Sequence, residues 1–143
     1  MSKRILVVDD DVAVRESLAQ VLAMENYEPL LAADARQAMD ILRTEAPDLV
    51  LLDITMPGKN GWDLFEKMEK LYPLVPVIII TAKPNQQGRA TGYGADALME
   101  KPLDLPLLLS TIEQFLAETP AQRIARLTNP KFVTPRLGHE YAH

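Results

Sequence analysis

Residues 48–58 read Asp48-Leu49-Val50-Leu51-Leu52-Asp53-Ile54-Thr55-Met56-Pro57-Gly58, and this stretch decides the fold. Its four consecutive aliphatic residues show no alternation of polar and apolar side chains, which predicts a strand buried on both faces of a parallel sheet. Asp53 stands where that strand ends, and Pro57-Gly58 turns the chain out of the sheet. A carboxylate at the carboxyl end of a central parallel strand lies where open α/β sheets bind ligands. Taken alone, Asp53 fits the capping of a turn equally well.

The composition fits one globular domain, because 48% of the 143 residues are hydrophobic. The net charge of −5 does not indicate a nucleic-acid partner for the chain as a whole. The absence of cysteine excludes disulfides and thiolate chemistry. The first residues do not resemble a signal peptide, and no apolar run approaches the roughly 20 residues of a membrane span. We therefore expect a cytoplasmic protein without membrane contact.

Strand and helix patterns alternate five times along the chain. Short apolar runs predict strands at 5–8, 27–31, 48–53, 75–81 and 96–99. Helical spacing predicts helices at about 12–24, 35–46, 64–71 and 105–116, and a poor helix at 83–93 that contains Pro84, Gly88 and Gly92. Pro29 cannot donate to a strand ladder, so the second strand is expected at an edge. The alternation predicts an α/β fold, a doubly wound parallel sheet with helices on both faces.

Polar residues follow four of the predicted strands, and in a parallel sheet these strand ends meet at one edge. They are Asp9, Asp10, Asp53, Thr81 and Lys101. Two carboxylates roughly 4 Å apart repel by about 4 kcal/mol at an effective dielectric near 20, which predicts a hard divalent cation such as Mg²⁺ between them. Lysine and threonine side chains suit phosphoryl oxygens. An aspartate beside such a metal is a competent nucleophile toward phosphorus, so the pattern predicts an aspartyl phosphate at Asp53.

Val7-Val8-Asp9-Asp10, Leu51-Leu52-Asp53 with Met56-Pro57-Gly58, Thr81-Ala82 and Lys101-Pro102 together resemble the CheY-like receiver domain of two-component response regulators. The resemblance covers about residues 3–118. It implies a flavodoxin-like, five-stranded sheet in the order 2-1-3-4-5. It also implies a phosphoprotein that signals when a sensor histidine kinase or phosphotransfer protein phosphorylates Asp53, with no enzymatic activity beyond self-catalysed phosphoryl transfer and autodephosphorylation.

The same resemblance implies roles for the site residues. Mg²⁺ would be held by Asp10, Asp53 and the backbone carbonyl of Thr55, with Asp9 acting through water. Thr81 and Lys101 would bind the phosphoryl oxygens. A cis peptide bond between Lys101 and Pro102 is also implied.

Leu98 departs from the family pattern, because receivers usually carry Tyr or Phe three residues before the lysine. Full burial of a leucine is worth about 1.5–3 kcal/mol, which favours one buried state with or without phosphate. A two-state switch needs a state-dependent contact. We therefore expect Leu98 to be buried and the usual aromatic switch to be absent.

Residues 119–143 form a tail of opposite charge to the preceding chain, with four basic residues and one acid. Thr119-Pro120-Ala121-Gln122 has the form of a capping box, which predicts a short helix from Pro120 to about Leu127. The tail either docks on its own acidic domain or on a partner, or is disordered, and the sequence leaves this open. About 25 residues after Glu118 are too few for a winged-helix output domain, which favours a stand-alone receiver that contacts an effector protein and no nucleic acid.

Two other classes of protein share parts of this pattern. Haloacid-dehalogenase-type phosphatases have the motif Asp-x-Asp at the nucleophile strand, with their acidic pair downstream. In this chain Thr55 stands in place of the second Asp of that motif, and the acidic pair Asp9-Asp10 precedes the strand. A receiver-fold interaction module that works without phosphorylation is the closer alternative. The intact acidic set argues against it, and Mg²⁺ binding discriminates the two.

Overall fold

The chain alternates strands and helices throughout its first 117 residues, as the sequence pattern predicts. The computed structural model describes residues 2–55 and 61–138. The elements are β1 (Arg4–Val8), α1 (Val12–Met24), β2 (Glu28–Ala32), α2 (Ala35–Glu45), β3 (Leu49–Asp53), α3 (Gly61–Leu71), β4 (Val77–Thr81), α4 (Gln87–Tyr93), β5 (Ala97–Glu100), α5 (Leu105–Ala117), α6 (Pro120–Thr128) and β6 (Arg136–Leu137).

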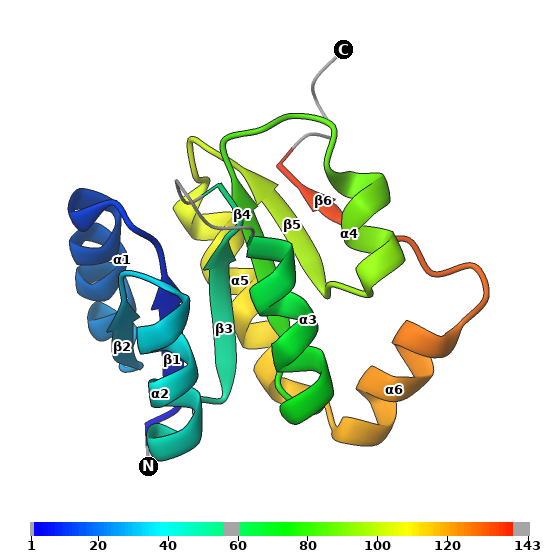
Figure 1. Cartoon of the computed structure of the whole chain (residues 1–143), viewed down its shortest axis with the longest axis horizontal. Helices are drawn as coiled ribbons and strands as arrows, with labels where there is room; N and C mark the ends of the chain where they lie inside the picture. Colours follow the sequence, from blue (N-terminus) through cyan, green and yellow to red (C-terminus); the bar gives the residue numbers. More distant parts are fainter. Residues whose placement is uncertain (1, 56–60, 139–143) are drawn as a thin grey trace.

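All strands belong to one parallel sheet, in the order β2-β1-β3-β4-β5-β6 (Figure 1). The flavodoxin-like order 2-1-3-4-5 is therefore confirmed for the first five strands. Pro29 lies in β2 at the edge of the sheet, where the missing N–H costs no ladder hydrogen bond. The predicted count of five strands was wrong by one, because β6 adds a short strand beyond β5.

The two faces of the sheet carry two separate apolar cores. Every residue of β3 is buried, and alternate side chains point to opposite faces. Val50 and Leu52 pack in a cluster with residues of α2 and α3. Leu49 and Leu51 pack in the other cluster, with residues of α1 and α5. A strand covered on both faces needs an unbroken apolar run, which is the pattern that the sequence shows.

The helix after β4 is shorter than the sequence pattern suggested. It occupies Gln87–Tyr93 rather than 83–93, since the residues from Lys83 to Gln86, which include Pro84, stay outside it. The helix then ends at Gly94, whose φ of 80° lies in the left-handed region that glycine adopts without strain. This shortening leaves a loop between Thr81 and α4, directly beside the predicted site.

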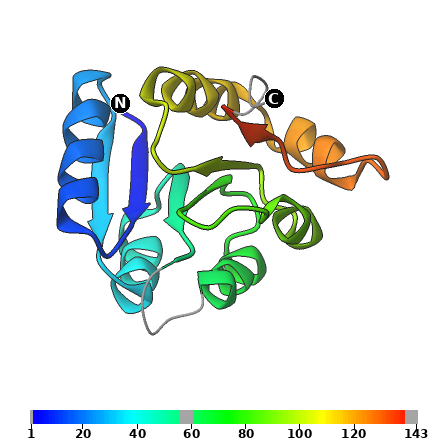
Figure 2. The same cartoon turned by 90° about the horizontal axis from the view of Figure 1, so that it is seen from above.

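The described part of the tail docks on its own domain. Helix α6 starts with the predicted capping box, in which the Thr119 side chain accepts from the Gln122 N–H and the Gln122 side chain accepts from the Thr119 N–H. The chain then turns back so that β6 pairs with β5 (Figure 2). Residues 119–138 therefore complete the edge of the sheet rather than remaining disordered. No helix in residues 2–55 and 61–138 is both long and apolar enough to cross a membrane.

Candidate functional site

Three carboxylates converge at the carboxyl ends of β1 and β3, as the strand-end pattern predicted. Asp9 and Asp10 directly follow β1, and Asp53 is the last residue of β3. One carboxylate oxygen from each lies within 4.8 Å of the others. Asp9 and Asp53 are buried, whereas Asp10 is exposed. An all-oxygen donor set of this kind, open to water on one side, fits a hard divalent cation such as Mg²⁺.

Lys101 reaches the same cluster from the end of β5. Its Nζ lies 3.0 Å from Asp9 Oδ2 and 3.2 Å from Asp53 Oδ2. The lysine side chain is largely buried between the two acids and shares its charge between them. Lys101 precedes Pro102 through a cis peptide bond, which confirms that expectation.

The pKa values at this cluster reflect opposing effects. Burial raises the pKa of the Asp9 carboxyl and the charge of Asp53 raises it further, while hydrogen bonds from the Asp11 amide and Lys101 oppose the change. Burial acts to lower the pKa of the Lys101 ammonium, but the hydrogen bond to Asp9 and the two neighbouring carboxylates outweigh it, so the pKa rises. The site therefore holds a firmly charged lysine and more negative charge than that lysine neutralises.

The two oxygens of Asp53 face different partners. Oδ1 accepts hydrogen bonds from the Thr55 N–H at 2.8 Å and the Thr55 hydroxyl at 2.5 Å. Oδ2 faces Lys101. The Thr55 N–H and hydroxyl thus fix the rotation of the Asp53 carboxylate, whereas the family resemblance implied a role only for the Thr55 carbonyl. The expected turn at Met56-Pro57-Gly58 lies outside the described residues.

Thr81 ends β4 beside β3 and is fully buried. Its hydroxyl oxygen accepts a hydrogen bond from the Lys83 N–H at 2.9 Å, which leaves the hydroxyl proton available as a donor. Its carbonyl accepts from the Lys101 N–H at 2.8 Å. The five residues predicted from strand ends therefore lie at one edge of the sheet.

Arg15 is a residue of this site that the sequence reading missed. Its Nη1 donates to the backbone carbonyl of Asp9 at 2.6 Å, while the Asp11 N–H donates to Asp9 Oδ1 at 2.9 Å. These two contacts hold Asp9 in place from both its backbone and its side chain. The available signal was weak, since an arginine in the first turn of a helix after an acidic cluster more often faces water.

Leu98 lies in the middle of β5 and is fully buried, as expected from its place in an apolar run. It packs in the core cluster that also contains Ala90 of α4 and Ala95. The burial of Leu98 is confirmed. The absence of the usual aromatic switch stays a prediction.

Known proteins share this arrangement of sheet and site. The family model of the response regulator receiver domain matches residues 5–113. Response regulator MprA of Mycolicibacterium vanbaalenii is 38% identical over 121 residues, which are 83% of this chain and 52% of that protein. A CheY-like response regulator receiver domain protein from Methanospirillum hungatei JF-1 gives a TM-score of 0.76 at 36% identity, over 81% of this chain and 94% of that one. The signal receiver domain of a DNA binding response regulator from Colwellia psychrerythraea 34H gives 0.75 at 28% identity, over 82% and 100%.

These relatives change two expectations drawn from the sequence. The chain spans about half the length of the response regulators that it matches, so the number of residues after Glu118 carries no argument about a further output domain. The expectation of a stand-alone receiver loses its basis. Similarity to the receiver domain of a DNA binding response regulator also leaves the expectation of no direct nucleic-acid contact unsupported.

The family match covers most of the chain, including β1, β3, β4 and β5, whose ends carry the site. The structural similarity to the solved CheY-like relative covers 81% of this chain, so the two share a fold. The chain belongs to the response regulator receiver domain family of two-component signalling proteins and has its flavodoxin-like fold.

Proposed function

We propose that Asp53 is the phosphoacceptor of this receiver domain and that a sensor histidine kinase or phosphotransfer protein is the donor. The observation that carries the proposal is the position of Asp53, buried between two further carboxylates and one lysine. In the transfer, an Asp53 carboxylate oxygen forms a bond to phosphorus while the phosphorus–nitrogen bond of the donor breaks. The electron pair of that bond stays on the donor imidazole, which takes a proton from water.

The hydrogen bonds of Asp53 favour Oδ2 as the attacking oxygen. Both Thr55 donors bind Oδ1, so that oxygen is less nucleophilic and the carboxylate cannot rotate freely. Oδ2 lies beside Lys101, whose ammonium would move from the carboxylates to the oxygens of the incoming phosphoryl group. The Thr81 hydroxyl would donate its proton to another of these oxygens.

A Mg²⁺ ion fits the donor set described above. Asp10, Asp53 and the backbone carbonyl of Thr55 would hold it, with Asp9 acting through water, and when bound it supplies the positive charge that the three carboxylates and a phosphoryl group require. Burial first, and then the charge of Asp53, raise the pKa of the Asp9 carboxyl even though Lys101 lies beside it.

The wider role follows from family membership and is part of the same proposal. Residues 3–118 act as the receiver unit and 119–143 as a tail. The phosphorylated form signals to a downstream effector, in the cytoplasm, and the chain has no enzymatic activity beyond phosphoryl transfer to Asp53 and hydrolysis of the aspartyl phosphate.

Intact mass measurement after incubation with a small phosphodonor tests the proposal. We expect one phosphoryl group to be added in the presence of Mg²⁺ and none in its absence. Asp53→Asn should abolish labelling, whereas Asp63→Asn, which changes an exposed acid on α3, should label like the wild type. Absence of both labelling and Mg²⁺ binding would favour the alternative, a receiver-fold module that acts without phosphorylation.

A further inference from the structure

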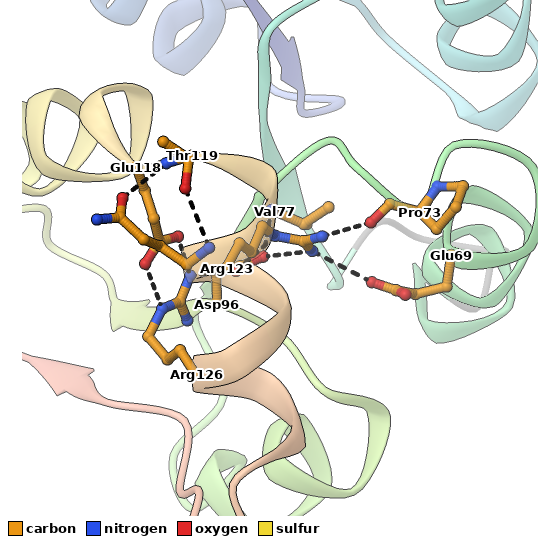
Figure 3. Close-up of polar contacts among 9 residues, drawn as sticks. Glu69, Pro73, Val77, Asp96, Glu118, Thr119, Arg123 and Arg126 are labelled. Atoms are coloured by element: carbon orange, nitrogen blue, oxygen red, sulfur yellow. Dashed lines mark hydrogen bonds and ion pairs between the residues drawn. The ribbon is translucent and has the colours of Figure 1, made fainter.

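Helix α6 is anchored by a buried ion-pair cluster at the amino end of β5. Asp96, which precedes β5, is fully buried and accepts from the Val77 N–H through Oδ2 at 2.8 Å. Arg123 of α6 binds the same carboxylate with two nitrogens, Nε to Oδ1 and Nη2 to Oδ2, both at 3.0 Å (Figure 3). Arg123 also donates to the carbonyl of Pro73. This fork fixes α6 against β4 and β5.

A second arginine closes the cluster. Arg126 donates through Nη2 to Asp96 Oδ1 at 2.8 Å and to Glu118 Oε1 at 2.7 Å, and its Nε donates to Glu118 Oε2 at 2.9 Å. Its guanidinium carbon lies 4.8 Å from the centre of the Phe115 ring. Two arginines of α6 thus hold one buried carboxylate, and α6 has little freedom to leave.

The segment after α6, residues 129–138, is held more lightly, and we call it the strap. Thr134 is its buried centre, and its hydroxyl donates to the Ala95 carbonyl at 2.7 Å. The Thr134 N–H donates to the Thr91 hydroxyl at 3.0 Å, and Gln87 Nε2 donates to the Thr134 carbonyl at 2.9 Å. Neutral hydrogen bonds, a two-residue strand and one longer ion pair, Arg136 with Glu100, therefore hold the strap in place of the bidentate fork that holds α6.

The strap contacts α4 and β5, which are the two elements next in sequence to Thr81 and Lys101 of the proposed phosphoacceptor site. On one side it bonds to α4, which follows Thr81 after the loop of residues 82–86. On the other side it pairs with β5, where the Leu98 N–H donates to the Pro135 carbonyl at 2.9 Å. Arg136 of the strap lies 3.7 Å from Glu100, the residue before Lys101.

Helix α4 is suited to transmit a change from Thr81 to the strap. It has only seven residues, includes Gly88 and Gly92, and lacks a side-chain cap at its start, so its own stability is low. The Thr81 hydroxyl now accepts from the Lys83 N–H. If that hydroxyl turns toward a phosphoryl group, this bond is disturbed at the start of the loop that leads into α4.

We propose that the strap is a conditional cover of the β5 edge, and that occupancy of the Asp53 site by a phosphoryl group weakens its docking while α6 stays anchored. The inference rests on the proposed function of Asp53. In the docked arrangement Lys101 binds the two carboxylates and the Thr81 hydroxyl binds its own loop. A phosphoryl group would redirect both, and so disturb the loop that leads into α4 and the end of β5, the two elements that hold the strap. By linkage, a released strap must favour site occupancy by the same factor.

Amide hydrogen exchange on the full chain, with and without Mg²⁺ and beryllofluoride as the phosphoryl mimic, tests this coupling. Occupancy of the site is measured separately by the fluorine resonance of the bound mimic. We expect faster exchange at the Leu98 and Thr134 amides, and faster tryptic cleavage after Lys131, by about fivefold or more, the lower end of typical coupling. Amides within α6 serve as the internal reference and should stay protected.

A pair of threonine variants separates the strap from general destabilisation. Thr134→Val removes the buried hydroxyl that holds the strap, so the strap should be released even without the mimic. The variant should then bind the mimic more tightly than the wild type does, by about fivefold or more. Thr128→Val changes an exposed hydroxyl that bonds only within α6, and it should behave as the wild type.

Three outcomes would contradict the inference. If the mimic binds and strap exchange is unchanged or slower, the coupling is wrong and the proposed function stands. If Thr134→Val releases the strap without changing the affinity for the mimic, the coupling is again wrong. If the mimic does not bind, the proposed function fails and the strap inference falls with it.

Discussion

The buried pair of Arg123 and Asp96 offers the sharpest test of what holds α6 in place. The side chains are 5% and 0% exposed, and two nitrogens of the guanidinium contact the carboxylate. Arg123→Met keeps an unbranched side chain and removes the charged fork. Loss of one partner of a buried pair costs about 3–5 kcal/mol. Asp96 keeps the Val77 N–H and Arg126 as partners, so we expect the lower end of that range, about 3 kcal/mol.

Urea denaturation followed by circular dichroism measures this loss, and a thermal scan should show a midpoint lower by about 6–12 °C for a chain of this size. The matched control is Arg43→Met. Arg43 lies 3.1 Å from Asp40, but those side chains are 69% and 55% exposed, so its removal should cost about 0.5 kcal/mol or less. A loss below about 1 kcal/mol for Arg123→Met, or one equal to that of the control, would refute the view that this ion pair stabilises the tail.

Three further substitutions test other parts of the structure. Gly61→Ala places a Cβ 2.4 Å from the Ile54 Cα, so it should destabilise by about 1–3 kcal/mol in urea, and an unchanged midpoint would contradict this packing. Leu98→Ala should cost about 2–5 kcal/mol, and methyl NMR of wild-type Leu98 should show the same buried environment with and without beryllofluoride. The hydrogen bond from Arg126 lowers the pKa of Glu118 below 4.5, so its stabilisation is present above that value and lost as the pH falls through the lower, folded value. Glu118→Gln should therefore remove part of the acid sensitivity of unfolding as the pH falls below about 4.5, and identical pH profiles would count against the pair.

The parts of the fold that the sequence predicted are those fixed by local patterns. The unbroken apolar run before Asp53 marks a central strand because burial on both faces tolerates no polar side chain. Pro29 marks an edge strand because it lacks a donor. Strand β6 could not be predicted in this way. Two residues after Pro135 have no periodicity, and their place depends on the Leu98 N–H, distant in the sequence.

The contacts of the site and of the tail show the same division between what local patterns predict and what depends on residues far apart in the sequence. The rule that parallel strands end at one edge brought together Asp9, Asp53 and Lys101 without any knowledge of distances. Pairings across long sequence separations were missed, such as Asp96 with Arg123. A signal did exist, because an acid directly before a buried apolar strand needs a buried partner, yet nothing in the spacing identifies which of the tail arginines provides it.

The two ends of this sheet hold carboxylates with different cations, and the choice has a consequence for how quickly each can change. At the amino end of β5, a planar guanidinium grips Asp96 with two bonds at once, so both must break together before another group can enter. At the carboxyl end, Lys101 is a single point charge on a flexible stem shared between two acids. The Lys101 ammonium can therefore transfer its hydrogen bonds one at a time to a third anion and keep a carboxylate partner throughout. The end of the sheet at Asp96 is thus suited to a lasting contact, and the end at Lys101 to the exchange of one anion for another.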